Sequence, residues 1–575
     1  MNLMFTAVTF VAFTALVAII SWWKTRGDNL DTQDGYYLAG RGLTGPVIAG
    51  SLLMTNLSAE QLVGNNGQAV RIGMSPMGWE VTSAIALVIL AFVLMPKYLK
   101  TGLTTVPEFF EQRYDAGTRR LVSFIVLLSY IIIMLPNVLY AGAQVFVNIF
   151  GIDQVFVTQF GMDAGSARFW AIAAVCVATA FAGSIYAIFG GLKAIAVSDS
   201  INGLGLIVGG LLVPIFGLIA LGAAHGGGFM EGLDAFLNTD KTLLNAIDAP
   251  NLNEPYLPWP LLLTGLLVNN MYYWATNQSI IQRAFGAKNL KEAQKGAVFA
   301  GFLKIMTPLI IVVPGVICAL AYPGQDWGNG NSAYPMLVAE VMPKPVLGFF
   351  AAVMFGAILS SFNSVLNSAS TIYALDIHRP IFNPTASDSH MVKVGQNFGT
   401  IVAVISTVMS PFMLYMTGIT TFVNSAFAAF NTPIFVCLLC GFFWKRVPAI
   451  AAKIVIPVHV VLYFILQFGL RNVIPALTDI HYLYFTAILF VFDMLLMWVI
   501  VKKNPRPEDF VLHDAKAVDM TPWKTGKFWA TVTLLIMVGA YVLFSPLGFG
   551  KSDTTTYERY LESQSTAAMT ETVLD

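Results

Sequence analysis

The chain has 575 residues, of which 56% are hydrophobic and only 11% are charged, and 32 Lys and Arg balance 32 Asp and Glu. A soluble chain of this length needs far more charge to cover its surface, so the composition indicates a membrane protein. Zero net charge suggests no nucleic-acid partner. The four cysteines lie in apolar runs, and we interpret even the CxxC pair Cys437 and Cys440 as packing residues.

Apolar runs of about 20 residues, long enough to cross a hydrocarbon core of about 30 Å, recur along nearly the whole chain. They predict an all-α protein with about fourteen transmembrane helices. The predicted spans are 4–23, 43–68, 78–98, 121–150, 167–189, 194–223, 256–282, 296–322, 344–375, 393–415, 417–444, 449–471, 478–501 and 527–547. The first is expected to be a retained helix, because no Lys or Arg precedes it and no cleavage site of small residues follows it.

Lys and Arg predict the orientation of these spans. With the N-terminus outside, 24 of the 32 basic residues fall in inner loops, Arg283 among them, 7 fall outside, and Lys304 falls within a span. Losing one helix from the series would scramble this bias. Both termini are therefore expected to face the periplasm, in a multi-pass protein of the bacterial inner membrane.

The loops exclude several classes of function. None is large enough for a catalytic domain, and neither HExxH nor GxSxG occurs, so the chain is not expected to be an enzyme. No GxxxxGK[ST] loop for ATP is present, and the run GLGLIVGG at 203–210 favours close helix packing inside a span. Transport would therefore draw its energy from an ion gradient.

Two predicted spans carry polar residues near their middles. The first reads SLLMTNLSAEQLVGNNG over 51–67 and the second LLVNNMYYWATNQ over 266–278. Such segments are tolerated where backbone lines a cavity or is buried in protein. Each opens a block of five helices, and interrupted helices at matching positions of two halves indicate an inverted-repeat transporter with a midplane site. Ordinary polar packing of two unbroken helices is the alternative.

Ionisable residues inside the spans are few, and each is a candidate functional residue with an expected partner because burial of its charge is costly. They are Glu60, Glu80, Asp199, Lys304, His459 and Asp493. A pair between Glu80 and Lys304 would cancel the charge of the cavity. His459 and Asp493 lie beyond the two blocks, which favours structural roles.

The stretch AILSSFNSVLNSAS over 357–370 is rich in hydroxyl groups. Small hydroxylated residues are common at helix contacts, and that interpretation alone would be preferred. Near a broken helix, however, the hydroxyls of Ser360 and Ser361 and freed carbonyls would supply the neutral oxygens that a monovalent cation prefers. A site without a formal carboxylate releases its ion readily on each cycle.

At these residues the sequence resembles the solute:sodium symporter family, and within it the sodium/galactose and YidK-type branches. The matching stretches are YYLAGRGL, TNLSAEQLVG, VPEFFEQRY, NNMYYWATNQSIIQR, EAQKG and SSFNSVLNSASTIYALDI, spread through 36–446. The resemblance implies a leucine-transporter-type core of five plus five helices, whose first helix in each repeat is discontinuous. The implied division is an N-terminal helix and inner loop at 1–42, repeats at 43–223 and 256–446, an outer loop at 224–255 and extra helices at 447–575.

The resemblance also implies roles for individual residues. The sodium ligands would be Met54, Leu57, Ala357, Ser360 and Ser361, the first three through their carbonyls. The sugar would be bound by Asn56, Gln61, Glu80, Ser83, Asn270 and Lys304. Tyr273 would be an inner gate stacking beneath the sugar ring, with Trp274 beside it, and Asp199 matches an acid linked to sodium exit or to a second sodium.

Four positions depart from the family pattern. Asn424 stands where the sodium/galactose branch has a further Gln at the sugar, Asn65 where it has an outer-gate Met, and Trp79 where it has a Tyr. Asn363 stands where some relatives have a second-sodium Ser. The first three leave the sugar open and the last leaves the stoichiometry open.

The sequence therefore predicts a secondary active symporter that couples inward sodium flow to uptake of a neutral, hexose-like sugar by alternating access. Symport of sialic acid, inositol or an amino acid is the alternative within the class. A transporter-like sensor is the alternative from another class, but the last 28 residues are too few for a signalling domain. The expected partners are the sugar, sodium as coupling ion and the lipid bilayer, without ATP or nucleic acid.

Overall fold

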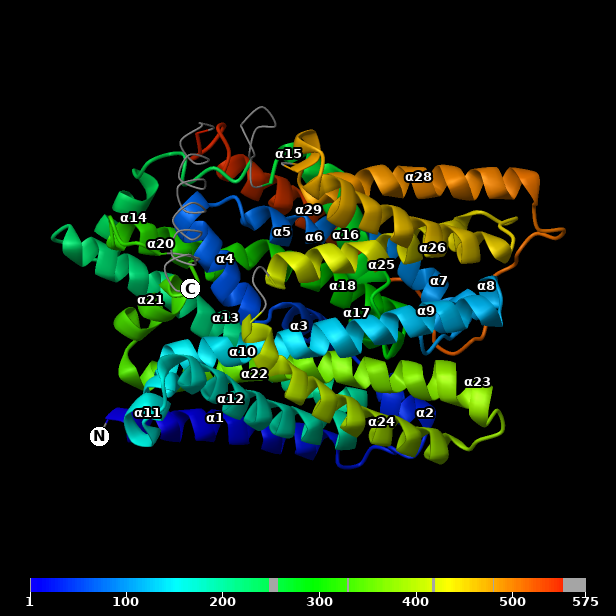
Figure 1. Cartoon of the computed structure of the whole chain (residues 1–575), viewed down its shortest axis with the longest axis horizontal. Coiled ribbons are helices and arrows are strands. Elements are labelled where there is room, and N and C mark those ends of the chain that lie inside the picture. Colours follow the sequence, from blue (N-terminus) through cyan, green and yellow to red (C-terminus); the bar gives the residue numbers. More distant parts are fainter. Residues whose placement is uncertain (1, 248–256, 328–329, 416–418, 479, 552–575) are drawn as a thin grey trace.

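A computed structural model describes residues 2–247, 257–327, 330–415, 419–478 and 480–551. These residues form helices and connecting turns, with two isolated β-bridges, Leu43 to Ala287 and Asn289 to Asp519. The long helices run side by side across Figure 1. This confirms the predicted all-α architecture.

The first half of the chain contains fourteen α-helices within the described residues. They are α1 (Asn2–Thr25), α2 (Gln33–Tyr37), α3 (Gly45–Asn56), α4 (Ala59–Ile72), α5 (Met77–Val81), α6 (Ser83–Ile89), α7 (Met95–Thr101), α8 (Val106–Arg113), α9 (Ala116–Ser129), α10 (Leu135–Phe150), α11 (Ile152–Phe160), α12 (Ala164–Ser184), α13 (Gly191–Ala224) and α14 (Phe229–Leu237). Turns of π-helix, η2 (Leu90–Leu94) and η3 (Tyr130–Met134), join α6 to α7 and α9 to α10, and η4 (Ile185–Phe189) extends α12. A 3₁₀ turn, η1 (Ala39–Arg41), precedes α3.

The second half continues in the same way. Its α-helices are α15 (Trp259–Leu263), α16 (Gly265–Ala275), α17 (Gln278–Phe285), α18 (Leu290–Met306), α19 (Pro308–Ile311), α20 (Val313–Ala321), α21 (Ala333–Val341), α22 (Lys344–Ile372), α23 (Arg379–Phe382), α24 (Asp388–Met409), α25 (Ile419–Phe443), α26 (Ile450–Phe464), α27 (Pro475–Thr478), α28 (Tyr482–Lys503) and α29 (Gly526–Leu543). The connecting π and 3₁₀ turns are η5 (Tyr373–His378), η6 (Ser410–Tyr415), η7 (Ile465–Gly469) and η8 (Leu470–Asn472).

Twelve helical segments within the described residues are long and apolar enough to cross a membrane. The two predicted spans missing from this set are 43–68, which the structure divides into α3 and α4, and 256–282, which it divides into α15, α16 and α17. The predicted total of fourteen is therefore not confirmed by length and composition. The two interruptions themselves occur within the polar stretches 51–67 and 266–278 that predicted them.

Each interruption is a capped start of a new helix. Leu57 leaves the helical conformation, and the Ser58 Oγ accepts a hydrogen bond from the Gln61 N–H at 3.2 Å. At the second break Asn277 takes the same position and its side chain accepts from the Ser279 N–H at 3.0 Å. Such caps satisfy the first amides of α4 and α17. The last carbonyls of α3 and α16 lose their helical partners at the same points.

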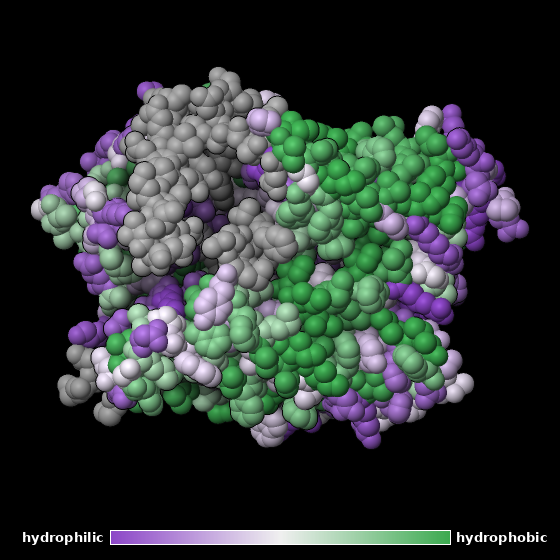
Figure 2. Space-filling model, in the orientation of Figure 1, coloured by the Kyte–Doolittle hydropathy of each residue, from purple (hydrophilic) through white to green (hydrophobic). Residues whose placement is uncertain are grey.

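The surface agrees with a membrane-spanning bundle. Figure 2 shows hydrophobic residues across the middle of the visible face and hydrophilic residues gathered toward its two ends. In Figure 1, α2, α8 and α23 lie at one end of the bundle, and α11, α14 and α21 lie at the opposite end. This division matches the alternation of inner and outer loops in the predicted topology.

The glycine-rich run 203–210 lies in α13, where it brings neighbouring helices close. A Cβ at Gly203 would come within 3.0 Å of the Met54 side chain in α3, and one at Gly210 within 2.5 Å of the Ile310 side chain in α19. Larger residues would force these helices apart. The run therefore packs α13 closely against its neighbours, as expected, and α3 is one of them.

Candidate functional site

The first interruption lies against the hydroxyl-rich part of α22. Ser361 Oγ donates to the Thr55 carbonyl at 3.4 Å, one residue before the end of α3. Ser360 Oγ is buried without a hydrogen-bond partner among the described residues. The predicted carbonyl ligands Met54, Leu57 and Ala357 are also buried. A buried oxygen whose lone pairs accept no hydrogen bond, beside freed carbonyls, fits a hard monovalent cation.

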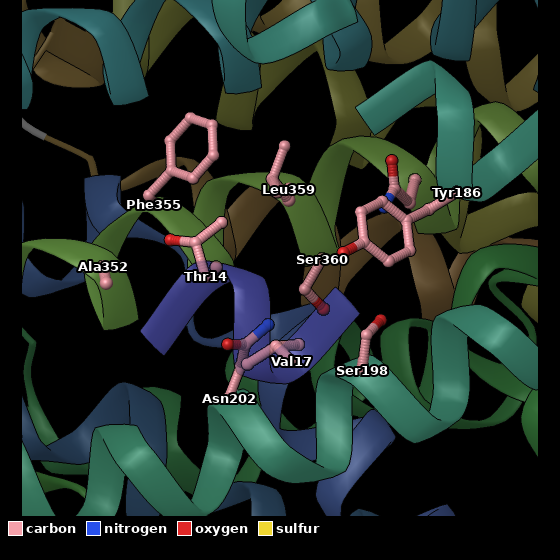
Figure 3. Close-up of a pocket in the computed structure, with 11 residues that line it drawn as sticks. Thr14, Val17, Tyr186, Ser198, Asn202, Ala352, Phe355, Leu359 and Ser360 are labelled. Carbon is pink, nitrogen blue, oxygen red and sulfur yellow. The ribbon is translucent and has the colours of Figure 1, made fainter. Parts of the chain in front are cut away.

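A small cavity opens beside Ser360, between α1, α13 and α22. Figure 3 shows Ser360, Ser198 and Asn202 around it, with Tyr186 at one side. Its volume is about 20 Å³, room for about one water-sized particle. Asn363 also lines it, and the Oδ1 of this residue is buried without a hydrogen-bond partner among the described residues.

Asp199 lies beside Ser360 and belongs to a buried network of charges. Its Oδ2 accepts from Ser51 Oγ at 2.6 Å and lies 3.9 Å from an Nη2 of Arg283. The Arg283 side chain is fully buried. The prediction that Arg283 is an inner-loop cation was therefore wrong: α17 runs on to Phe285 and carries this guanidinium into the core.

A second ion pair joins Glu80 of α5 to Lys304 of α18. The two side chains contact each other directly and are 3% and 1% exposed. Asn56, the last residue of α3, accepts a second hydrogen bond from Lys304, and Thr307 Oγ1 lies 3.1 Å from Glu80 Oε2. The expected pairing of Glu80 with Lys304 is therefore present. It places a neutralised but strongly polar group at the end of the first broken helix.

Aromatic residues of α16 cover this pair. Lys304 Nζ lies 5.8 Å from the centre of the Trp274 ring, a cation–π geometry that favours its charge. Tyr273 packs edge-on against Trp274, with ring centres 5.2 Å apart, and it lies beside Asn56. Trp274 is buried, whereas Tyr273 is only half-buried.

The structure describes the side chains of three of the four remaining predicted sugar residues. Ser83 Oγ donates to Asn270 Oδ1 at 3.2 Å, which joins α6 to α16, and leaves Asn270 Nδ2 buried without a partner among the described residues. Gln61 lies in the first turn of α4, and its buried Oε1 also has no hydrogen-bond partner in the part of the chain that the structure describes. Such leftover groups are available to a bound polar molecule. The Asn424 side chain lies outside the described residues.

Tyrosines that the sequence reasoning missed hold the second interruption. Tyr98 donates to the Ala275 carbonyl at 2.7 Å, and Tyr130 donates to the capping oxygen of Asn277 at 2.5 Å. The hydroxyl of Tyr130 also accepts from the Ser279 N–H at 3.1 Å. Hydroxyl groups inside apolar spans were the available signal, because a buried phenol requires a hydrogen-bond partner.

The other intramembrane ionisable pair lies away from this region. His459 of α26 and Asp493 of α28 are fully buried and their nearest atoms are 2.6 Å apart. This contact joins two helices beyond the predicted repeats. The cysteines Cys176, Cys318, Cys437 and Cys440 are free and buried, as expected of packing residues.

Comparison with known proteins identifies the group to which this chain is related. The Sodium:solute symporter family model matches residues 36–454. The chain is 42% identical to the uncharacterized symporter YidK of Escherichia coli over 541 residues, which cover 94% of this chain and 91% of that protein. It is 30% identical to the sodium/glucose cotransporter of Vibrio parahaemolyticus, covering 76% of this chain and 80% of that protein.

Among solved structures, the fold is similar to that of a Na⁺-coupled sialic acid symporter in a substrate-bound outward-open state. The TM-score is 0.71 with 18% identity, over 88% of this chain and 99% of that one. This likeness confirms the predicted leucine-transporter-type fold. The chain belongs to the sodium:solute symporter family, so it is a membrane transporter of a small solute, not an enzyme, and sodium is its coupling ion.

Proposed function

We propose that this member of the sodium:solute symporter family carries a neutral, hexose-like sugar inward together with sodium. The buried pair of Glu80 and Lys304 at the end of α3 is the observation that supports this proposal most directly. An anionic solute would need an unpaired cation in the pocket, and Lys304 is already neutralised. A polyol needs donors and acceptors side by side, and this pair supplies both.

The proposed pocket surrounds this pair. Gln61 Oε1 and Asn270 Nδ2 are buried groups that a sugar hydroxyl would complete, and Ser83 orients Asn270. The remaining proposed sugar ligands are Asn56 and Asn424. Because each hydroxyl missing from an analogue leaves one of these groups unpaired, the pocket would reject deoxy-sugars strongly. Similarity to the sodium/glucose cotransporter favours a hexose as the solute. The uptake experiment described below compares hexoses with other solutes of the family.

The proposed sodium site is built on the same helix end. Its oxygens are the carbonyls of Met54, Leu57 and Ala357 and the hydroxyls of Ser360 and Ser361. Sugar and ion would then share α3, so that each stabilises the conformation of the break that the other requires. Asp199, beside Ser360, would lie on the sodium exit path or take part in a second sodium site.

Tyr273 is the proposed inner gate of the sugar pocket. It lies in the last turn of α16, directly before the second interruption, so its ring can turn without disturbing a continuous helix. An aromatic face packs well against the apolar C–H face of a sugar ring. Its edge-on contact with Trp274 would hold the ring in place while the pocket is closed.

The proposed setting is the bacterial inner membrane, with both termini periplasmic and with repeats at 43–223 and 256–446 moving by alternating access. One sodium ion entering down about 100 mV and a tenfold gradient supplies about 3.7 kcal/mol. This limits one-to-one accumulation of a neutral sugar to several hundredfold.

Purified protein in liposomes provides the test. We expect uptake of a labelled hexose to require an inward sodium gradient, and to be inhibited by unlabelled hexoses more strongly than by sialic acid, inositol or proline. Equal uptake without sodium would contradict the coupling. Preference for sialic acid or proline would contradict the neutral-sugar pocket while leaving sodium coupling intact.

A further inference from the structure

Arg283 connects all the elements that meet at the proposed sodium site. Its Nε donates to Ser51 Oγ of α3 at 3.1 Å, Nη2 contacts Ser364 Oγ of α22, and Nη1 contacts the Ser279 carbonyl within α17. Asp199 of α13 lies 3.9 Å from Nη2. The guanidinium is thus a fully buried cation shared by four helices, and each of its nitrogens has a partner.

The protons of the two serines show how the cation acts on its neighbours. Ser51 Oγ donates its single proton to Asp199 and therefore accepts from Arg283. Ser364 Oγ donates to the Ser360 carbonyl at 2.6 Å and accepts from Arg283. Thr55 Oγ1, 3.0 Å from Ser364, then acts as a further donor to it. Arg283 therefore orients one hydroxyl of α3 and one of α22.

The charge of Arg283 also determines what Asp199 presents to a cation. Asp199 Oδ1 is buried and has no hydrogen-bond partner among the described residues, and the carboxylate lies beside Ser360. An isolated carboxylate in that position would attract sodium strongly, since charges interact strongly where water is excluded. With Arg283 close by, the carboxylate and the guanidinium together are neutral, and the attraction is largely cancelled.

We propose that Arg283 is the positioning residue that keeps sodium binding reversible, by neutralising Asp199 and by orienting Ser364, which bonds the Ser360 carbonyl. This inference rests on the proposed sodium site and adds to it the element that sets affinity and release. We assign this role to binding of the monovalent cation rather than of the sugar, because Arg283 contacts Ser51 and Ser364 and lies near Asp199, next to the proposed ion site.

The test compares variants by the sodium concentration that gives half-maximal uptake, and by the maximal rate. Arg283→Gln should lower that concentration about tenfold and also lower the maximal rate, because an unneutralised Asp199 holds sodium and delays its release. Arg283→Lys retains the charge but loses the forked contacts, so its half-maximal sodium concentration should stay closer to wild type than that of Arg283→Gln. An unchanged or higher half-maximal sodium concentration in Arg283→Gln would overturn the proposal.

A second comparison does not depend on the folding of that single variant. Asp199→Asn leaves Arg283 as an unpaired cation and should raise the half-maximal sodium concentration about tenfold. Adding Arg283→Gln to Asp199→Asn should bring it back to within about threefold of wild type. If the double variant were no better than Asp199→Asn, Asp199 would be a direct ligand and the neutralising role of Arg283 would be wrong.

The pair of Arg119 and Asp376 provides a matched control. It is another ion pair with a buried carboxylate, and it joins α9 to η5 without a described contact to Ser360, Ser361 or Asp199. Arg119→Gln should reduce the amount of folded protein without shifting the half-maximal sodium concentration. Sodium-independent uptake by the wild type would contradict the proposed function itself. Sodium-dependent uptake by the wild type, with no shift in the Arg283 and Asp199 variants, would contradict only the role proposed for Arg283.

Discussion

Replacing Glu80 with Gln separates the charge of the proposed sugar pocket from its shape. Glu80 and Lys304 are almost completely buried, so the variant leaves the Lys304 ammonium without a countercharge, beside neutral groups such as Asn56 and the face of Trp274. Stranding one partner of a buried ion pair costs about 3–5 kcal/mol. The lower figure corresponds to more than a hundredfold in an equilibrium constant, since each 1.4 kcal/mol is tenfold.

We therefore expect Glu80→Gln to reduce sodium-driven sugar uptake at least about a hundredfold and to lower the thermal unfolding temperature in detergent. Thr307→Val removes one hydroxyl next to Glu80 and should cost about tenfold in uptake. Asp28→Asn breaks the Lys193–Asp28 pair, at 2.6 Å but partly exposed, and should change uptake less than about fivefold. Comparing these two variants with Glu80→Gln shows how the loss of uptake depends on the burial and the charge of the group that is removed.

The double variant Glu80→Leu/Lys304→Met distinguishes a binding role from a structural one. Replacing both charges by apolar groups of similar size removes the stranded ion, so the unfolding temperature should return to the wild-type value or exceed it. Sugar uptake should stay absent, because no donor or acceptor is left at the pair. Full sugar transport by this double variant, or by Glu80→Gln, would refute the proposed pocket.

Four further outcomes are expected. Ser361→Ala should weaken sodium binding and abolish uphill uptake, because it removes one of about five oxygens from the proposed ion site; unchanged sodium dependence in a concentration series would count against that site. Tyr273→Phe should retain accumulation whereas Tyr273→Ala should lose it, and equal accumulation by both would exclude the gate. Gln61→Ala should weaken sugar binding, seen in calorimetry, by about 1–3 kcal/mol with sodium binding nearly intact; a loss of sodium binding alone would contradict its place in the sugar pocket. Because the native cysteines are buried, Met230→Cys should react with an impermeant thiol reagent from the periplasm and Glu508→Cys only after the membrane is opened; the reverse pattern would invert the topology.

Much of the architecture could be predicted from local properties of the chain. Long apolar runs specify membrane spans, because backbone groups in hydrocarbon must be satisfied within a helix. Asn56 and Ser58, and later Asn277, mark the interruptions because polar side chains that cap a new helix also end the preceding one. The pairing of Glu80 with Lys304 followed from the cost of burying either charge alone.

Other features depend on residues far apart in the chain. The connection after α28 runs across the ends of helices from both halves: the Ala515 N–H donates to the Lys100 carbonyl at 2.9 Å, and the Leu290 N–H donates to the Asp519 carbonyl at 3.0 Å. Its polar sequence predicted only a loop. Backbone hydrogen bonds of this kind leave no pattern in the side chains, so only the tertiary structure reveals them.

The sequence by itself determined a membrane-spanning, all-helical chain with two broken spans and an internal carboxylate–ammonium pair. It did not determine the position of Arg283, because an arginine just beyond an apolar run is typical of a helix end at the inner surface. The tertiary structure decided that position by bringing Asp199, Ser51 and Ser364 from three other helices around the guanidinium. A charge enters the core only where its partners are already assembled, and their assembly depends on packing between helices rather than on any local pattern of residues.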